Sequence, residues 1–279
     1  MATSAIARHY GSAGIAERVM AGLRAANGPD APVTPEALAP FDHFHGRGVA
    51  ATAELVALLR PQRGERIIDI GSGIGGPARW IAAQCGVHVT GVDLTAEFCA
   101  AAEALTAACG MTDRVTIMQG SALDLPLPDA AFDRAYSQNA VMNIADKLQF
   151  CREAFRVLRP GGVFGLACAC AVPGGGGIHF PVPWATTAAE SFLATEDEMR
   201  AALIAAGFAI VSFESADGRP QPALPQVPPV GASATALAIQ FILGERVQEM
   251  VANMARNAAE RLTTTIEALV RKPGVRKPG

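Results

Sequence analysis

This sequence of 279 residues has little charge, few tyrosines and tryptophans, and no internal cluster of basic residues. Charged residues make up only 18% of the chain, and the formal net charge is −3. Because nucleic-acid binding normally needs a basic face, we expect no nucleic-acid partner. With two Trp and two Tyr, the composition does not indicate an aromatic cage for a quaternary amine.

Long apolar runs and secretion signals are also missing. The longest apolar run, Val163–Val172, is far shorter than the roughly 18–20 residues of a membrane-spanning helix. Residues 1–26 mix charged and apolar side chains, without the apolar stretch of a secretory signal. We therefore expect a soluble, cytoplasmic protein with no membrane partner.

The six cysteines follow no spacing that is typical of a metal or redox site. Cys168 and Cys170 lie in an apolar run that predicts a strand, and residues i and i+2 of a strand share one face. We interpret them as buried, reduced thiols, and we expect no metal.

What the sequence does contain is a regular alternation of strands and helices from about residue 65. The predicted strands are residues 65–71, 87–93, 115–120, 132–137, 163–170 and 208–215, and the predicted helices are residues 75–86, 95–110, 146–159 and 195–207. Repeated βα units require a parallel sheet with right-handed crossovers and helices on both faces. The predicted fold class is therefore α/β, with a Rossmann-like doubly wound sheet.

Two regions lie outside this alternation. Residues 1–60 are predicted helical with proline breaks, and a Pro- and Gly-rich stretch at 216–231 precedes a predicted long helix at 232–261. Thr263–Arg271 fits a final strand and a helix almost equally well. We expect a helical N-terminal cap (1–60), a Rossmann-like core (61–215), a linker and helical lid insertion (216–261), and a last strand with a basic tail (262–279).

A glycine-rich loop, D-I-G-S-G-I-G-G at Asp69–Gly76, joins the first predicted strand to its helix. Gly71 and Gly73 allow a tight turn and close approach of a ligand to the backbone. Asp93 ends the next strand, where a carboxylate can accept hydrogen bonds from both ribose hydroxyls. Gly71, Gly73 and Gly76 also satisfy G-x-G-x-x-G, so this pattern alone leaves a nicotinamide or flavin enzyme open.

Two features favour S-adenosylmethionine over a dinucleotide. Asp69 would repel a pyrophosphate, but it suits the ammonium group of S-adenosylmethionine. In addition, the loop follows about 60 residues of helical sequence, whereas dinucleotide-binding domains often open with it.

Five segments, within residues 67–162, then occur in order: I-I-D-I-G-S-G-I-G-G, V-T-G-V-D-L-T, D-R-V-T-I-M-Q-G-S-A-L-D-L-P-L-P-D, A-F-D-R-A-Y-S-Q and R-V-L-R-P-G-G. Together they resemble class I S-adenosylmethionine-dependent methyltransferases. The segments H-Y-G (9–11), F-D-H-F-H-G (41–46), M-N-I-A-D-K (142–147) and P-V-P-W-A (181–185) are similar to the sarcosine/dimethylglycine methyltransferase-like group, near the ubiquinone/menaquinone-biosynthesis type.

The resemblance implies a mostly parallel sheet whose last two strands, Phe208–Ser215 and Thr263–Arg271, form an antiparallel pair at one edge. It also implies S-adenosylmethionine as cofactor. It places Asp69 near the amino group, Gly71, Ser72 and Gly73 against the methionine part, Asp93 at the ribose, Leu94, Ser121 and Ala122 around the adenine, and Gln138 by the methionyl end. The family usually has Asp where this chain has Ser121, which predicts weaker binding of the adenine amino group. Relatives often carry a polar residue where the fifth strand reads A-C-A-C, so one substrate contact is missing here.

Methyl transfer from a sulfonium is an in-line displacement, which needs alignment and exclusion of water. A base is required only when the nucleophile starts protonated. We predict His45 and Tyr10 as catalytic or substrate-contacting residues, and His43, Asn143, His179 and Trp184 as lining the substrate pocket.

The predicted enzyme is a methyltransferase that acts on a small molecule, at N or O first and with C or S left open. Two other hypotheses stay open: an NAD(P)-dependent oxidoreductase that uses the same loop, and a non-catalytic protein that binds S-adenosylmethionine. A homodimer is neither required nor excluded by the sequence.

Overall fold

The computed structural model describes residues 14–43, 45, 47–215 and 246–274. Its seven strands are β1 (Arg66–Ile70), β2 (His88–Asp93), β3 (Val115–Gln119), β4 (Phe132–Gln138), β5 (Leu158–Ala171), β6 (Ala209–Ser215) and β7 (Thr263–Arg271). Its α-helices are α2 (Ile15–Asn27), α3 (Pro35–Asp42), α4 (Val49–Leu59), α5 (Gly76–Cys85), α6 (Ala96–Ala108), α7 (Lys147–Val157), α8 (Glu196–Ala205) and α10 (Val247–Ala259). Two short 3-10 helices are η1 (Val141–Asn143) and η2 (Ala188–Glu190).

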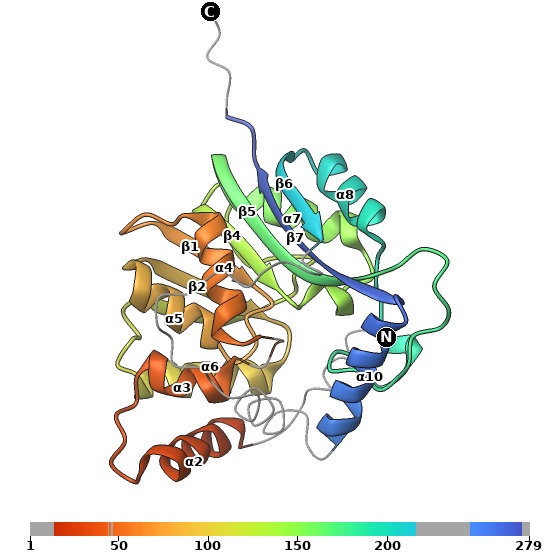
Figure 1. The fold of residues 1–279 in the computed structure, drawn as a ribbon. Coiled ribbons are helices and arrows are strands. Elements are labelled where there is room, and N and C mark those ends of the chain that lie inside the picture. The colour runs from red at the N-terminus through yellow and green to blue at the C-terminus, as the bar shows by residue number, and fades with distance from the viewer. Residues whose placement is uncertain (1–13, 44, 46, 216–245, 275–279) are drawn as a thin grey trace, which may run out of the picture.

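The strands form one sheet in the order β3-β2-β1-β4-β5-β7-β6 (Figure 1). Strands β1 to β5 pair in parallel, whereas β7 runs antiparallel to both β5 and β6. The order reverses between β1 and β4, and in open α/β sheets ligands bind at such a point, beyond the carboxyl ends of the strands. The α/β Rossmann-like fold predicted from the sequence is confirmed.

Helices cover both faces of the sheet. One core cluster packs α7 and α8 on the sheet and includes Phe150 and Phe164. Another lies on the opposite face, where Leu55 and Leu59 of α4 contact strand residues such as Val163. Neighbouring strand residues such as Val163 and Phe164 thus enter different cores, because side chains alternate across a sheet.

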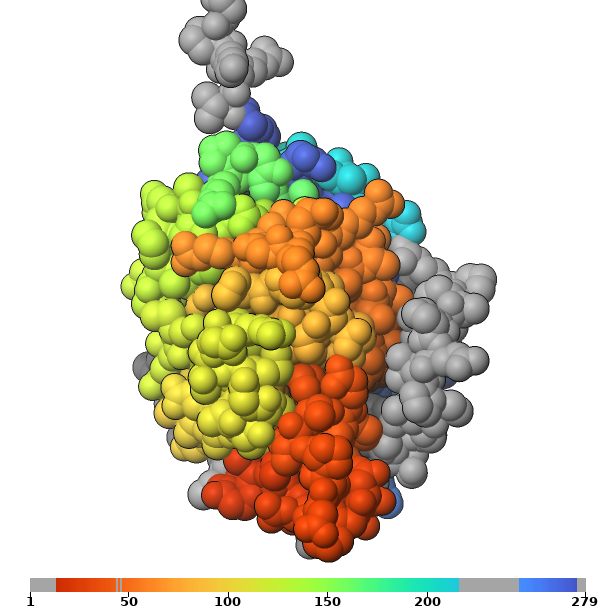
Figure 2. Space-filling view, turned by 90° about the vertical axis from the view of Figure 1, so that its left-hand side faces the viewer, coloured from red at the N-terminus to blue at the C-terminus, as the bar shows by residue number. Residues whose placement is uncertain are grey.

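The N-terminal helices pack onto this framework. Val19 of α2 and Leu38 of α3 share a cluster with Leu105 of α6, and all three are fully buried. Figure 2 shows this part of the chain, in red and orange, forming one continuous surface with the segments that follow it. The predicted helical character of residues 1–60 is confirmed for the residues described, while the proposed domain boundaries stay a prediction.

Several predicted elements are confirmed, with differences at their ends. Thr195 forms the predicted capping box with Glu198 at the start of α8. Thr95 precedes α6, but its side chain makes no capping bond; its backbone N–H donates to Asp93 instead. Thr263–Arg271, which the pattern left open, is strand β7. Of the predicted helix at 232–261, Val247–Ala259 forms α10, and residues 216–245 lie outside the described part.

Candidate functional site

The glycine-rich loop leaves β1 with a tight turn. Gly71 has φ +84°, and a Cβ added there would lie 2.3 Å from the Cβ of Ala140, so this position requires glycine. The backbone N–H groups of Gly71 and Ser72 both donate to the Val92 carbonyl, at 2.8 and 3.1 Å. The loop is therefore fixed to the end of β2, at the carboxyl edge of the sheet.

Asp93, at the end of β2, closes the loop from the other side. Its carboxylate accepts from the Gly73 N–H at 2.8 Å and from the Thr95 N–H at 2.9 Å. Burial raises the pKa of Asp93, and these N–H donors oppose that rise by stabilising the carboxylate. The structure thus brings together Gly71, Ser72, Gly73 and Asp93, as the sequence predicted.

Asp69 lies on β1 just before the loop and is 2% exposed. Its Oδ2 accepts a hydrogen bond of 2.8 Å from the hydroxyl of Tyr136, which is fully buried on β4. The pKa of Asp69 is raised to about 7, because burial and the charge of Asp93 raise it more than the bond from Tyr136 lowers it. A carboxylate in this position suits a ligand that brings its own positive charge.

The predicted adenine-side residues follow β2 and β3. Leu94 is half-buried, and its carbonyl accepts from the Gln119 side chain at 3.2 Å. The hydroxyl of Ser121 accepts from the Leu123 N–H at 3.1 Å, so it is engaged in a local turn. Ala122 packs against the edge of the core cluster under α7 and α8. These residues lie next to the ends of their strands, where the prediction put them.

Gln138, at the end of β4, is connected to the N-terminal helices. Thr52 of α4 donates to Gln138 Oε1 at 3.1 Å, and His45 Nε2 lies 3.4 Å from the same Thr52 hydroxyl. Gln138 is 8% exposed, and its Nε2 has no hydrogen-bond partner among the described residues. The structure therefore links two residues predicted from sequence, His45 and Gln138, through Thr52, which was not predicted.

The same region contains a second buried polar atom, the Ser72 hydroxyl oxygen, with no partner in the described part of the chain. Buried polar groups are nearly always hydrogen-bonded in a complete protein. Two such orphaned atoms at the carboxyl edge, a glycine loop and a buried carboxylate fit a ligand that carries a carboxylate, an ammonium and hydroxyl groups. S-adenosylmethionine has all three, so the residues present fit the predicted cofactor.

His43, predicted to line the substrate pocket, belongs to a buried ionic network. Its Nδ1 lies 2.7 Å from Asp42 Oδ1, and Arg79 donates to Asp42 Oδ2 at 2.9 Å. Burial by itself would raise the pKa of Asp42, but the hydrogen bond of His43 and the charge of Arg79 hold it below its usual value. Gly76 permits this approach, since a Cβ there would lie 2.4 Å from the Asp42 carbonyl. The network fastens α3 to the first turn of α5.

The other predicted pocket residues hold the segment after β5 in place. Asn143 donates to the Trp184 carbonyl at 2.6 Å, and the Trp184 indole N–H donates to Ser191 at 2.9 Å. His179 contacts α10, through Glu260 at 2.7 Å and through both backbone groups to Asn257. Tyr10 lies outside the described residues, so its predicted role stays a prediction.

Thr52 and Tyr136 are the site residues that sequence reasoning missed. Thr52 falls on the buried face of α4 with Leu55 and Leu59, and a polar residue on an apolar helix face was the available signal. Tyr136 gave no signal, because only the β1–β4 register places it opposite Asp69.

Beyond Gln138, the β5–β7 pair forms a strip of small and polar side chains that we name the β5–β7 shelf. Gln138 is in register with Ala167, and the next pairs on that face are Ala167–Glu267 and Ala169–Thr265. Thr265 is exposed although it lies on an inner strand. At the Gln138 end of this face, Leu55 and Leu59 of helix α4 lie against Gly165.

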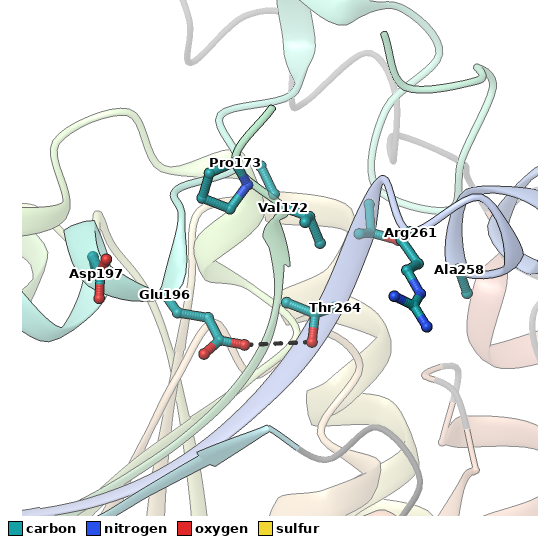
Figure 3. Close-up of a pocket in the computed structure, with 9 residues that line it drawn as sticks. Val172, Pro173, Glu196, Asp197, Ala258, Arg261 and Thr264 are labelled. Atoms are coloured by element: carbon teal, nitrogen blue, oxygen red, sulfur yellow. Dashed lines mark hydrogen bonds between the residues drawn. The ribbon is translucent and has the colours of Figure 1, made fainter. Parts of the chain in front are cut away.

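A pocket of about 380 Å³ opens at the far end of this shelf. It is lined by Ala171, Val172, Pro173, Glu196, Asp197, Ala258, Arg261, Thr263 and Thr264. Figure 3 shows Glu196 reaching from the start of α8 to the Thr264 hydroxyl, at 3.4 Å, with Arg261 on the other side of Thr264. The pocket thus lies at the carboxyl end of β5, several residues beyond Gln138.

Three further findings concern the cysteines, candidate metal ligands and membrane-spanning helices among the described residues. All six cysteines are free, and four of them are buried. Within the described ranges, no group of three or more His, Cys, Asp or Glu side chains could hold a metal ion. No described helix is long and apolar enough to span a membrane.

Comparison with known proteins gives matches that agree with this geometry. Residues 68–166 match the family model described as a methyltransferase domain. Methyltransferase GfsG of Streptomyces halstedii is 32% identical over 127 residues, which is 46% of each chain. O-methyltransferase resE of Aspergillus sclerotiorum is 27% identical over 209 residues, covering 73% of this chain and 75% of that protein.

Among solved structures, the [4+2]-cyclase SpnF has a TM-score of 0.65 with 22% identity, covering 94% of this chain and 95% of the other. That likeness establishes the fold. The sequence match spans less than half the length of GfsG, so it supports the domain and leaves the substrate undetermined.

Proposed function

We propose that this chain, which carries a class I S-adenosylmethionine-dependent methyltransferase domain, methylates an oxygen atom of a small molecule that lies on the β5–β7 shelf. The domain match and the methyltransferase relatives support the enzyme class. The observation that carries the proposal is the loop closed by Asp93 beside buried Asp69. This arrangement suits the ammonium group of S-adenosylmethionine, whereas a phosphate would bring a further negative charge beside Asp69 and Asp93.

His45 is the proposed proton acceptor. When bound, S-adenosylmethionine supplies the methyl group of its sulfonium, so an acceptor hydroxyl must lose its proton as its bond to the methyl carbon forms. His45 is held near the end of β4 through Thr52, and the imidazole of a neutral histidine can receive that proton. O-methyltransferase resE, which aligns over 73% of this chain, supports oxygen as the nucleophile.

The shelf suits the acceptor because it begins beside Gln138, which Thr52 links to His45. Its side chains Ala167 and Ala169 are small, and Ala169 is half-buried beside exposed Thr265. Gln138 Nε2 is a buried donor without a partner in the described residues. It is available to donate a hydrogen bond to an oxygen of the methyl acceptor or to the cofactor. We assign the His45–Thr52–Gln138 chain to alignment of the acceptor oxygen, which is the main requirement of an in-line displacement.

The first experiment is a thermal-shift comparison of S-adenosylhomocysteine with NAD. A ligand that binds only the folded state raises the melting temperature, and 100-fold excess over Kd adds about 2.7 kcal/mol. We expect stabilisation by S-adenosylhomocysteine alone. A shift with NAD alone would restore the oxidoreductase hypothesis and overturn the proposal.

The second experiment identifies the acceptor. Incubation with S-adenosylmethionine and metabolite extracts should give O-methyl products, each heavier than its precursor by one methylene. Products methylated at N, C or S would contradict the choice of oxygen. Tight binding of S-adenosylhomocysteine with no methylated product would favour the non-catalytic hypothesis.

A further inference from the structure

The buried carboxylate of Asp69 has an unusual environment for a charged group. It is 2% exposed, and it accepts a hydrogen bond from the neutral hydroxyl of Tyr136 at 2.8 Å. Burying an ionised carboxylate without a cation is costly, so such a group tends to hold a proton. In the free protein, the Asp69 carboxyl group therefore readily holds a proton, and the Asp69–Tyr136 pair is then neutral.

Within the described ranges, the elements around Asp69 bring no positive charge to its carboxylate. From β2, the facing group is Asp93, whose negative charge opposes ionisation of Asp69. From α5, the buried cation is Arg79, but its guanidinium is committed to Asp42, the Ile74 and Ala102 carbonyls and the Thr106 hydroxyl. From the α4 side, His45 lies beside Thr52. Among the described residues, no ion pair involves Asp69.

Tyr136 is placed to orient the Asp69 carboxylate and to lower its pKa through a hydrogen bond. It is the register partner of Asp69 across the β1–β4 ladder, so the two side chains share one face. Its ring is fully buried in the cluster that contains Leu55 and Leu59 of α4, which fixes the direction of the hydroxyl. Burial and the neighbouring carboxylate raise the pKa of Tyr136 well above its usual value, so it stays a donor.

We propose that Tyr136 is a positioning residue of the cofactor site, and that binding of the cofactor expels the proton held by Asp69. The proposal rests on the proposed function, because the cation that replaces this proton is the ammonium of S-adenosylmethionine. The proton passes from the Asp69 carboxyl group to solvent, and the carboxylate left behind pairs with the ammonium. The Tyr136 hydroxyl donates to the carboxylate in both states.

This coupling predicts a definite pH dependence. Because the pKa of Asp69 is raised to about 7, the free protein at lower pH must lose a proton before it can bind the ammonium. Linkage then makes binding about tenfold weaker at pH 6 than at pH 8. Removal of the Tyr136 hydroxyl removes a donor that lowers this pKa, so it moves the pH dependence upward.

The experiment is calorimetric titration of the full chain with S-adenosylhomocysteine between pH 6 and 8.5, in buffers of different ionisation enthalpy. For the natural protein we expect about half a proton released per ligand at pH 7. Tyr136→Phe should bind roughly three- to tenfold more weakly at pH 7, release more protons, and recover most of its affinity at pH 8.5. Asp69→Asn should bind weakly with no proton release.

Ser137→Ala is the matched control. Ser137 is fully buried on the same strand, and its hydroxyl donates to the Ile70 carbonyl at 2.7 Å, away from Asp69. Its loss should cost stability and leave the proton count unchanged. The inference would be overturned if Tyr136→Phe lowered the affinity for S-adenosylhomocysteine equally at all pH values, or if the natural protein bound this ligand without proton release. Failure of the natural protein to bind S-adenosylhomocysteine would instead overturn the proposed function.

Discussion

The hydroxyl of Thr52 lies 3.1 Å from Oε1 of Gln138, and this contact joins helix α4 to the carboxyl end of β4. The two residues are 86 positions apart in the chain. The bond fixes the Gln138 amide so that Oε1 faces α4, which leaves Nε2 for a ligand. Because His45 approaches the same hydroxyl, this contact connects the proposed base with the end of the strand nearest the glycine loop.

Replacement of Thr52 with valine tests that connection. Valine keeps the shape of threonine but cannot donate to Gln138, so the amide is free to turn. We expect methyl transfer to fall about tenfold, in kcat rather than in cofactor affinity, at a stability cost of about 1 kcal/mol. Thr52→Ser, which keeps the hydroxyl, is the control. A tenfold loss of S-adenosylhomocysteine affinity in Thr52→Val would place the Gln138 amide in the cofactor site.

Asp93→Asn should weaken S-adenosylhomocysteine binding about 10- to 100-fold. The carboxylate accepts two backbone N–H groups and is proposed to accept the ribose hydroxyls, and an amide nitrogen can accept none of these. Calorimetry measures the affinity directly. Asp113→Asn, with a side chain that is 72% exposed in the turn before β3, should bind like the natural protein. Unchanged affinity in Asp93→Asn would remove Asp93 from the cofactor site.

Arg79→Met should destabilise the fold by about 3–5 kcal/mol, because it leaves the buried carboxylate of Asp42 without its cation. The double variant Asp42→Asn, Arg79→Met should recover part of this loss, since no charge is then buried. Urea unfolding provides the measurement. If the double variant is no more stable than Arg79→Met, the buried charge is not the cause.

The interaction of Asp42 with Arg79 also predicts how the unfolding free energy depends on pH in the acid range. The pKa of Asp42 is lowered from 3.8 in the folded protein, because the hydrogen bond of His43 and then the charge of Arg79 outweigh burial. Folding therefore favours the ionised form. The stability that the pair contributes is therefore present above pH 3.8 and is lost as the pH falls through the lower folded value. The difference in unfolding free energy between the natural protein and the double variant should shrink below about pH 4.

Thr265→Phe tests the β5–β7 shelf as the acceptor site. Thr265 is exposed on this strip, so a phenyl group fits there without entering the core. We expect it to occupy the shelf and to lower methyl transfer about 10- to 100-fold through misplacement of the acceptor. Binding of S-adenosylhomocysteine should not change. Ile204→Phe, at a position 55% exposed on α8, is the control. Full activity in Thr265→Phe would exclude the shelf.

For the predicted pocket residues, residue type alone did not reveal the hydrogen-bond partners. His43, Asn143, Trp184 and His179 attracted notice as polar or aromatic groups in motif segments. In the structure they bond to Asp42, to backbone carbonyls, to Ser191 and to α10. A sequence displays a hydrogen-bonding group, but its partner is set by segments that lie far away in the chain.

The sequence by itself determined the features whose cause is local. Periodicity and the glycines predicted the βα units, the loop at Asp69–Gly76 and the place of Asp93, because steric limits on φ and side-chain alternation act within a few residues. The residue pattern of Thr263–Arg271 fitted a strand and a helix almost equally well, and the tertiary structure makes it a strand because its backbone groups pair with β5 and β6. It also decided the Asp69–Tyr136 and Thr52–Gln138 bonds, which span 67 and 86 residues and depend on strand register and helix placement.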